Sequence, residues 1–171
     1  VPIPVNTLWK PQDYGHVLND SRARVLIVSE KVLPVIDQLP RRDLPFLTHT
    51  IVVGGAAGSM SFASLLDRGT PEFQAAPTRR DDQAFWLYSS GSTGAPKGCV
   101  HRQHDMTVCA GAFAKDVLRM NESDRCFSVA KLFFAYGLGN ALYMPFSVGA
   151  TSILWSGRPT AADMYRVIEA H

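Results

Sequence analysis

Short apolar runs alternate along this chain with segments of helical pattern. The clearest runs are residues 24–29 (RVLIVS), 49–55 (HTIVVGG), 84–89 (AFWLYS) and 151–156 (TSILWS). The continuous, β-branched run at 24–29 is typical of a strand buried on both faces of a parallel sheet, in which the intervening helices form the crossovers. The alternation therefore predicts an α/β fold with a mostly parallel sheet and helices on both faces.

The same pattern places the remaining elements. Two more strands are expected, over residues 3–9 and 125–131. Helices are expected over residues 13–21, 30–39, 62–69, 105–118, 138–148 and 161–170. Thr160 with Asp163 three residues on is a capping-box pattern that predicts where the last helix begins.

Composition excludes several classes of partner. The 17 Lys and Arg nearly balance the 15 Asp and Glu, giving a net charge of +2 without a concentrated basic face, so a nucleic-acid partner is not expected. No apolar run approaches the roughly 20 residues of a membrane span, so a membrane partner is not expected either. The three cysteines (Cys99, Cys109 and Cys126) form no C-x-x-C pair, which favours reduced thiols and a cytoplasmic location. Nothing in the sequence indicates an oligomeric state.

A glycine-rich loop follows the strand predicted at 84–89 and reads SSGSTGAPKG. Glycines let the backbone curl so that its amides point inward, and the hydroxyls and Lys97 add further donors. Amides, hydroxyls and a lysine on one concave surface form a phosphate cradle. The loop therefore predicts a phosphate-binding site at the carboxyl end of a strand, where ligands bind in such folds.

Two other interpretations of this loop fit less well. A Walker A loop has Gly before its lysine and Ser or Thr after it, whereas Lys97 follows Pro96 and precedes Gly98. A flexible Gly/Ser linker is the other alternative, but the loop ends in an ordered Pro-Lys-Gly and is expected to stand between a strong strand and a strong helix.

The loop carries a family resemblance. Residues 89–98 match at every position the signature Ser/Thr-Ser-Gly-Ser/Thr-Thr-Gly-x-Pro-Lys-Gly, so the chain resembles adenylate-forming enzymes: acyl-CoA synthetases, adenylation domains and luciferases. Residues 1–30 also resemble the family segment that precedes the loop, and residues 131–140 (KLFFAYGLGN) stand where the family has its acyl-pocket segment. The resemblance implies that residues 1–171 are the middle of a large AMP-binding N-terminal domain, without the C-terminal lid domain.

The resemblance also implies a reaction. In the family this loop binds the phosphates of ATP, supplied with Mg²⁺, while a substrate carboxylate attacks the α-phosphorus; in CoA ligases, CoA then takes the acyl group. The phosphate-binding residues implied here are Ser89, Ser90, Gly91, Ser92, Thr93, Gly94 and Lys97, of which Thr93 and Lys97 are the expected catalytic residues. No residue is assigned as a metal ligand.

The acyl-pocket segment indicates the substrate class. Many carboxylate–CoA ligases have a histidine where this chain has Phe134, and the FFAYGLG segment looks most like benzoate–CoA ligases. Phe134, Ala135, Tyr136 and Gly137 are therefore the expected substrate-binding residues, with aromatic walls suited to a flat ring. The alternative is that these aromatics are ordinary core residues. The particular aromatic acid does not follow from this segment.

The five histidines do not indicate a catalytic group. His101 and His104 follow the loop but lack the spacing and third ligand of a metal site, which favours a packing role; His16, His49 and His171 have no such group around them in the sequence.

The family's Tyr-Gly-x-Thr-Glu segment, ribose-binding Asp and lid lysine do not occur in these 171 residues. We therefore expect a piece of a longer enzyme that is inactive by itself. An adenylation domain that loads a carrier protein and a non-catalytic nucleotide-binding module remain as alternatives.

Overall fold

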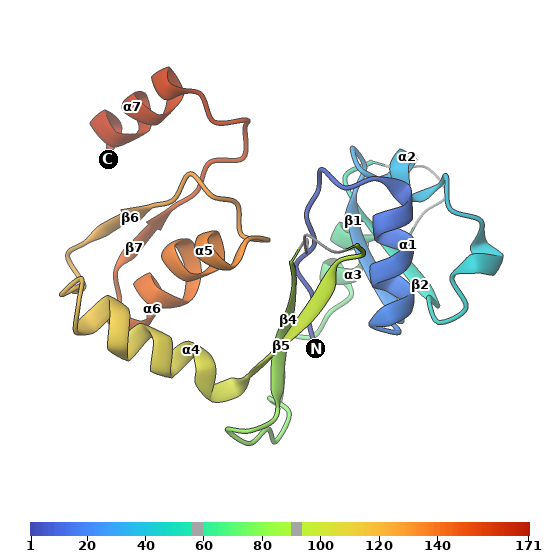
Figure 1. Ribbon diagram of the computed structural model, residues 1–171, viewed down its shortest axis with the longest axis horizontal. Coiled ribbons are helices and arrows are strands. Elements are labelled where there is room, and N and C mark those ends of the chain that lie inside the picture. The colour runs from blue at the N-terminus through green and yellow to red at the C-terminus, as the bar shows by residue number, and fades with distance from the viewer. Residues whose placement is uncertain (56–59, 90–93) are drawn as a thin grey trace. The chain divides into compact units, whose positions relative to one another are not determined.

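The computed structural model describes residues 1–55, 60–89 and 94–171. Its α-helices are α1 Pro11–Asp20, α2 Leu33–Ile36, α3 Phe62–Asp67, α4 Gln103–Cys109, α5 Ala135–Leu138, α6 Met144–Val148 and α7 Ala161–Ala170. Its strands are β1 Val25–Ser29, β2 His49–Val53, β3 Met60–Ser61, β4 Gln83–Ser89, β5 Lys97–Arg102, β6 Arg125–Phe127 and β7 Thr151–Ile153. A 3₁₀ turn, η1 Arg41–Asp43, and two π-helical stretches, η2 Ala110–Lys115 and η3 Gly139–Tyr143, complete the elements. Figure 1 shows the helices and strands along the chain. Within these residues no helix combines the length and the apolarity that crossing a membrane requires.

The chain divides into two compact units. One contains Val1–Asn6, Thr78–Leu87 and Cys99–His171, and the other contains Thr7–Pro77 and Tyr88–Gly98. The described strands form three small sheets, ordered β1-β2-β3, β4-β5 and β6-β7. β1 pairs with β2 in parallel, as do β2 with β3 and β6 with β7, so the predicted α/β class with parallel pairing is confirmed.

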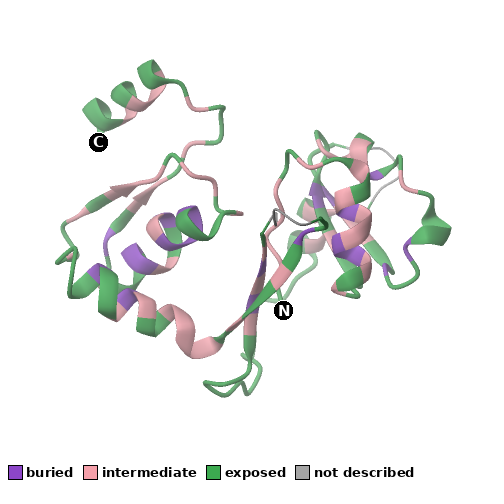
Figure 2. Cartoon of the chain, viewed as in Figure 1, coloured by how far each residue is buried: buried purple, intermediate pink, exposed green. Residues whose placement is uncertain are grey.

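In the unit that contains α1, one face of the β1-β2-β3 sheet is covered. Leu18 of α1 packs with Leu44 and Leu47 in a buried cluster that Leu26 of β1 joins from the sheet. Residues of β1 alternate, because successive side chains of a strand point to opposite faces: Val28 is 7% exposed, whereas Ile27 is 57% exposed. Figure 2 shows how buried and exposed residues are distributed over the elements. The expectation that residues 24–29 are buried on both faces is therefore wrong for this chain.

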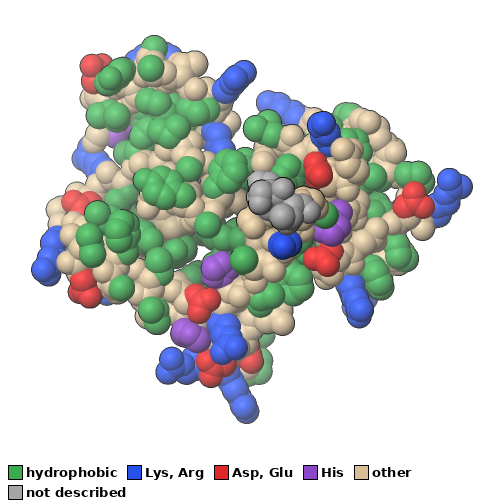
Figure 3. Space-filling model, in the orientation of Figure 1, with side chains coloured by type: hydrophobic (Ala, Val, Ile, Leu, Met, Phe, Trp, Pro, Cys, Tyr) green, Lys and Arg blue, Asp and Glu red, His purple; other side chains and the backbone are tan. Residues whose placement is uncertain are grey.

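The other unit has its core between β4 and the helices. Phe85, Leu87 and Leu138 form the buried cluster, and Met106 and Tyr143 pack against it. Apolar side chains also stay exposed over the surface of this unit (Figure 3), and no residue of α7 is buried. The predicted start of α7 is confirmed, because the Thr160 hydroxyl donates to Asp163 Oδ2 at 2.7 Å and accepts from the Asp163 N–H at 3.2 Å.

The helical stretch from α5 through η3 to α6 starts three residues before the helix predicted at 138–148. Pro145 has no N–H, so it cannot donate to the Ala141 carbonyl four residues earlier. The Ser152 hydroxyl of β7 donates to that carbonyl instead, at 2.5 Å. The irregular helix is thus tied to the strand that follows it.

Other expectations fail for local reasons. Residues 3–9 form no strand; Pro2 and Pro4 cannot donate to a ladder, although the Pro2 carbonyl accepts from the Trp86 N–H at 3.1 Å. The helix expected over 30–39 shrinks to α2, which begins beside Pro34. The helix expected over 105–118 begins at Gln103 and ends at Lys115. Strands β3 and β5 were not predicted.

Candidate active site

The two ends of the glycine-rich loop are held by strands. Ser89 is the last residue of β4, and Lys97 is the first residue of β5. The loop is therefore followed by a strand, and the expectation of a helix directly after it is wrong. Gly94 has φ +135°, a left-handed conformation that favours glycine. Four of the predicted phosphate-binding residues, Ser90, Gly91, Ser92 and Thr93, lie outside the described residues.

At the Pro-Lys-Gly end of the loop, a buried proline is followed directly by an exposed lysine. Pro96 is buried, and its carbonyl oxygen lies 2.8 Å from His16 Nε2 of α1. Lys97 is exposed and forms no ion pair with any residue that the structure describes. The lysine amine is thus available for an anion, while the residue before it is anchored.

The other end of the loop is anchored by the same helix. The Tyr88 hydroxyl donates to Asp20 Oδ2 at 2.6 Å. Burial raises the pKa of Tyr88 above its usual value, and the hydrogen bond to the Asp20 carboxylate raises it further. Because Tyr88 precedes Ser89, α1 contacts the chain on both sides of the loop.

Sequence reasoning did not find His16 or Asp20. They lie far from the loop in the sequence, and only the fold brings them to it. Their spacing of one helical turn places both on the same side of α1, but it does not connect them with the loop.

The predicted acyl-pocket residues lie at the start of α5, in the unit that holds β6 and β7. Phe134 is 47% exposed and Tyr136 is 71% exposed, and the Phe134 ring contacts the Phe133 ring at 4.6 Å between centroids. Gly137 is buried against the backbone carbonyls of Ala130 and Lys131. The segment therefore presents two aromatic side chains to the surface beside a glycine that packs inward.

A pocket of about 390 Å³ opens beside this segment. Ala135 is the predicted substrate-binding residue that lines it. The other lining residues, from β4, β5, α4 and the neighbouring helical turns, are Phe85, Leu87, His101, His104, Asp105, Met106, Val108, Cys109, Ala112, Leu138 and Tyr143. Most of this lining is apolar, as in sites for small organic ligands.

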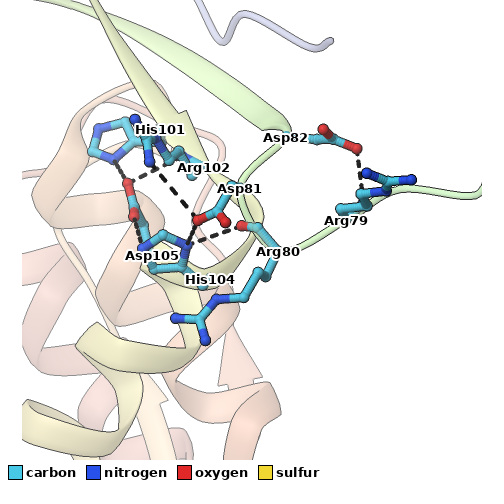
Figure 4. Close-up of polar contacts among 8 residues, drawn as sticks. All are labelled: Arg79, Arg80, Asp81, Asp82, His101, Arg102, His104 and Asp105. Atoms are coloured by element: carbon cyan, nitrogen blue, oxygen red, sulfur yellow. Dashed lines mark hydrogen bonds and ion pairs between the residues drawn. The ribbon is translucent and has the colours of Figure 1, made fainter.

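The two histidines after the loop take part in a polar cluster at the end of β5 (Figure 4). The His101 ring stacks on Phe85 at 4.6 Å, and its Nδ1 lies 3.3 Å from Asp105 Oδ2. His104 Nδ1 lies 2.9 Å from the Arg80 carbonyl oxygen, and its Nε2 lies 3.3 Å from Asp105 Oδ1. These contacts hold both rings in place, as the predicted packing role requires.

Asp105 is the centre of this cluster. It accepts a hydrogen bond from the Arg102 N–H at 3.0 Å, as a residue in the first turn of α4 does when it caps the helix. That backbone hydrogen bond, together with the electrostatic effect of the neighbouring His104, lowers the pKa of Asp105 below its usual value. The carboxylate is thus held ionised by the helix start and by its histidine neighbours.

Metal ligands and disulfides do not define this site. Across residues 1–55, 60–89 and 94–171, no group of three or more His, Cys, Asp or Glu could hold a metal ion. Cys99, Cys109 and Cys126 are all unpaired.

Comparison with known proteins agrees with these features. The AMP-binding enzyme family matches residues 1–171. A benzoate–CoA ligase of Thauera aromatica is 50% identical over 171 residues, which are 100% of this chain and 32% of that protein. The chain thus spans about a third of that relative's length.

Solved structures agree as well. A benzoate CoA ligase from Burkholderia xenovorans superposes with a TM-score of 0.87 at 41% identity, covering 100% of this chain and 33% of that one. An anthranilate CoA ligase in complex with anthranoyl-AMP gives a TM-score of 0.89 at 40% identity, covering 97% of this chain and 32% of that one. With its phosphate-loop signature, its parallel α/β fold and a family match along its full length, the chain belongs to the family of AMP-binding enzymes.

Proposed function

We propose that this chain is part of an ATP-dependent carboxylate–CoA ligase that activates a benzoate-like aromatic acid. The observation that carries the proposal is the 50% identity, along the whole chain, to a benzoate–CoA ligase. The chain would supply the middle of the N-terminal AMP-binding domain, and a lid domain elsewhere in the parent enzyme would complete the site. The three unpaired cysteines fit a reducing, cytoplasmic setting.

The proposed reaction has two steps. The acid's carboxylate oxygen attacks the α-phosphorus of ATP, the bond from that phosphorus to the bridging oxygen breaks, and pyrophosphate leaves. The CoA thiol then attacks the carbonyl carbon of the acyl-adenylate, AMP leaves, and the thiol proton passes to solvent. Negative charge grows on the departing pyrophosphate in the first step, where prearranged donors stabilise it most.

We assign phosphate binding to the loop, by Ser89, Ser90, Gly91, Ser92, Thr93, Gly94 and Lys97, with Thr93 and Lys97 as the catalytic residues. The exposed Lys97, at the anchored end of the loop, supports this assignment. Mg²⁺ would arrive with ATP, bound to the phosphate oxygens of the nucleotide.

We assign the acyl site to Phe134, Ala135, Tyr136 and Gly137. The support is the apolar pocket that Ala135 lines, whose volume of about 390 Å³ is within the range of small-ligand sites. Exposed aromatic rings at Phe134 and Tyr136 offer faces for stacking on a flat ring.

The proposal is tested with the full-length parent protein, supplied with ATP, CoA and one acid at a time. We expect benzoate to give benzoyl-CoA, AMP and pyrophosphate, and acetate to react far more slowly. A preference for acetate, or the absence of AMP with every aromatic acid, would refute it. Transfer of the acyl group to the pantetheine arm of a carrier protein, and not to CoA, would instead establish the adenylation-domain alternative.

A further inference from the structure

We propose that helix α1 is a clamp that positions the phosphate loop, with His16 as the positioning residue for Lys97 and Asp20 holding the opposite end of the loop. This inference rests on the proposed function, because it takes the loop to be the ATP phosphate site. His16 and Asp20 are separated by one turn of α1 and contact Pro96 and Tyr88, which flank the loop.

The clamp has a rigid base. Tyr14, Val17 and Leu18 of α1 are buried, and Leu18 belongs to a core cluster of this unit. Side chains of a packed helix keep their positions, because well-packed interiors leave little room for movement. The contacts from α1 therefore anchor both ends of the loop to the core of this unit.

The contact at Pro96 fixes the backbone that leads into Lys97. A buried carbonyl oxygen needs a donor, and the His16 Nε2–H supplies one to Pro96 at 2.8 Å. The Pro96 carbonyl and the Lys97 nitrogen belong to one planar peptide group. Holding that carbonyl therefore sets the plane from which the Lys97 side chain departs.

The contact does not require a charged imidazole. A neutral ring protonated at Nε2 and an imidazolium both donate from this atom. Position 16 needs one side-chain N–H donor that reaches the Pro96 carbonyl. A glutamine amide also provides such a donor. A leucine has similar bulk and no donor.

Loss of the His16 contact should affect the binding and the reaction of ATP. Without a fixed backbone the Lys97 side chain is not held toward the phosphates, and misplacement of a catalytic group slows chemistry as well as weakening binding. The hydrogen bond that His16 forms goes to Pro96, at the end of the loop. The clamp therefore predicts an effect on the KM for ATP and on kcat, with the KM for the acid unchanged.

The test compares His16→Leu with His16→Gln in the full-length parent protein. We expect His16→Leu to raise the KM for ATP about three- to tenfold, the worth of one lost hydrogen bond, and His16→Gln to stay within about twofold of the wild type. An unchanged KM for ATP in His16→Leu would overturn the clamp. So would an equal loss of activity with both variants and no change in either KM, because that pattern reports only a loss of folded protein.

Hydrogen exchange separates this inference from the proposed function. In the nucleotide-free protein, the peptide that covers residues 94–98 should exchange faster in His16→Leu than in the wild type or in His16→Gln. Equal exchange in all three proteins would refute the clamp even if the enzyme is active. Faster exchange in a parent that forms no acyl-adenylate would support the clamp and refute the proposed function.

Discussion

Gly137 lies directly against the backbone of Lys131. A Cβ built on Gly137 would stand 2.1 Å from the Lys131 carbonyl oxygen and 2.5 Å from that of Ala130. Contacts this short cannot be accommodated without moving backbone. The glycine in the FFAYGLG segment is therefore explained by the close approach of two chain segments, and the aromatic residues beside it are set at the surface by that packing.

Replacing Gly137 by alanine should destabilise the protein by about 1–3 kcal/mol, because the added methyl overpacks a buried site. Gly111 offers a matched control, since a Cβ there meets nothing within 4 Å. Gly111→Ala should be neutral or stabilise by up to about 1 kcal/mol. Chemical denaturation of both variants checks the pair, and equal stability of the two would contradict the packing described here.

Ser152→Ala should cost about 1–3 kcal/mol of folding stability. The change removes the hydroxyl that donates to the Ala141 carbonyl, to which Pro145 cannot donate. Ser147, an exposed residue on the same helical stretch, is a control, since its hydroxyl donates to the nearby Met144 carbonyl three residues earlier. Ser147→Ala should change the unfolding free energy by less than about 0.5 kcal/mol. A larger loss from Ser147→Ala than from Ser152→Ala would be the opposite of this expectation.

The Asp105 carboxylate should contribute stability that depends on pH. Its pKa is lowered in the folded protein, chiefly by the Arg102 N–H, so the folded state binds this proton less readily than the unfolded state. The contribution is then fully present above the usual carboxyl pKa and is lost as the pH falls through the lower, folded value. The unfolding free energies of wild type and Asp105→Asn, measured from neutral to acid pH, should converge at the acid end. A difference that grows on acidification would show that the sign is wrong.

Local patterns predicted much of this fold. The start of α7 follows from Thr160 and Asp163, which cap the helix through atoms three residues apart, and the strands β1, β2, β4, β6 and β7 all coincide with apolar runs. The sequence does not predict β5, because residues 97–102 (KGCVHR) have no apolar pattern. These residues are extended because they pair with β4. Tertiary pairing of this kind overrides local preference.

In the candidate site too, local features could be predicted from the sequence and features that depend on tertiary contacts could not. The loop signature in residues 89–98 is local, so the sequence alone indicated a phosphate site and its lysine. The anchoring of Pro96 by His16 joins residues that are 80 positions apart, and only the folded chain brings them together. The packing of Gly137 on Lys131 likewise depends on how the turn before α5 folds back. The path of that turn could not be predicted from a pattern of residues.

The 171-residue chain alone should show no ligase turnover. It holds the residues to which we assign phosphate binding and the acyl site, while the family's adenine and ribose motifs and lid lysine do not occur in it. Benzoate-dependent exchange of pyrophosphate into ATP checks this with purified chain, and the full-length parent is the positive control. Robust exchange by the chain alone would show that these missing parts are not needed.

The central claim is that the loop ending in Lys97 stabilises the transfer of the adenylate group. The direct measurement is single-turnover formation of benzoyl-adenylate by the full-length parent enzyme and its Lys97→Ala variant, with Lys115→Ala, an exposed lysine of η2, as the control. We expect Lys97→Ala to slow adenylate formation about 100-fold or more, as the loss of a preorganised charge at a transition state does, and Lys115→Ala to match the wild type. An unchanged single-turnover rate in Lys97→Ala would contradict the account.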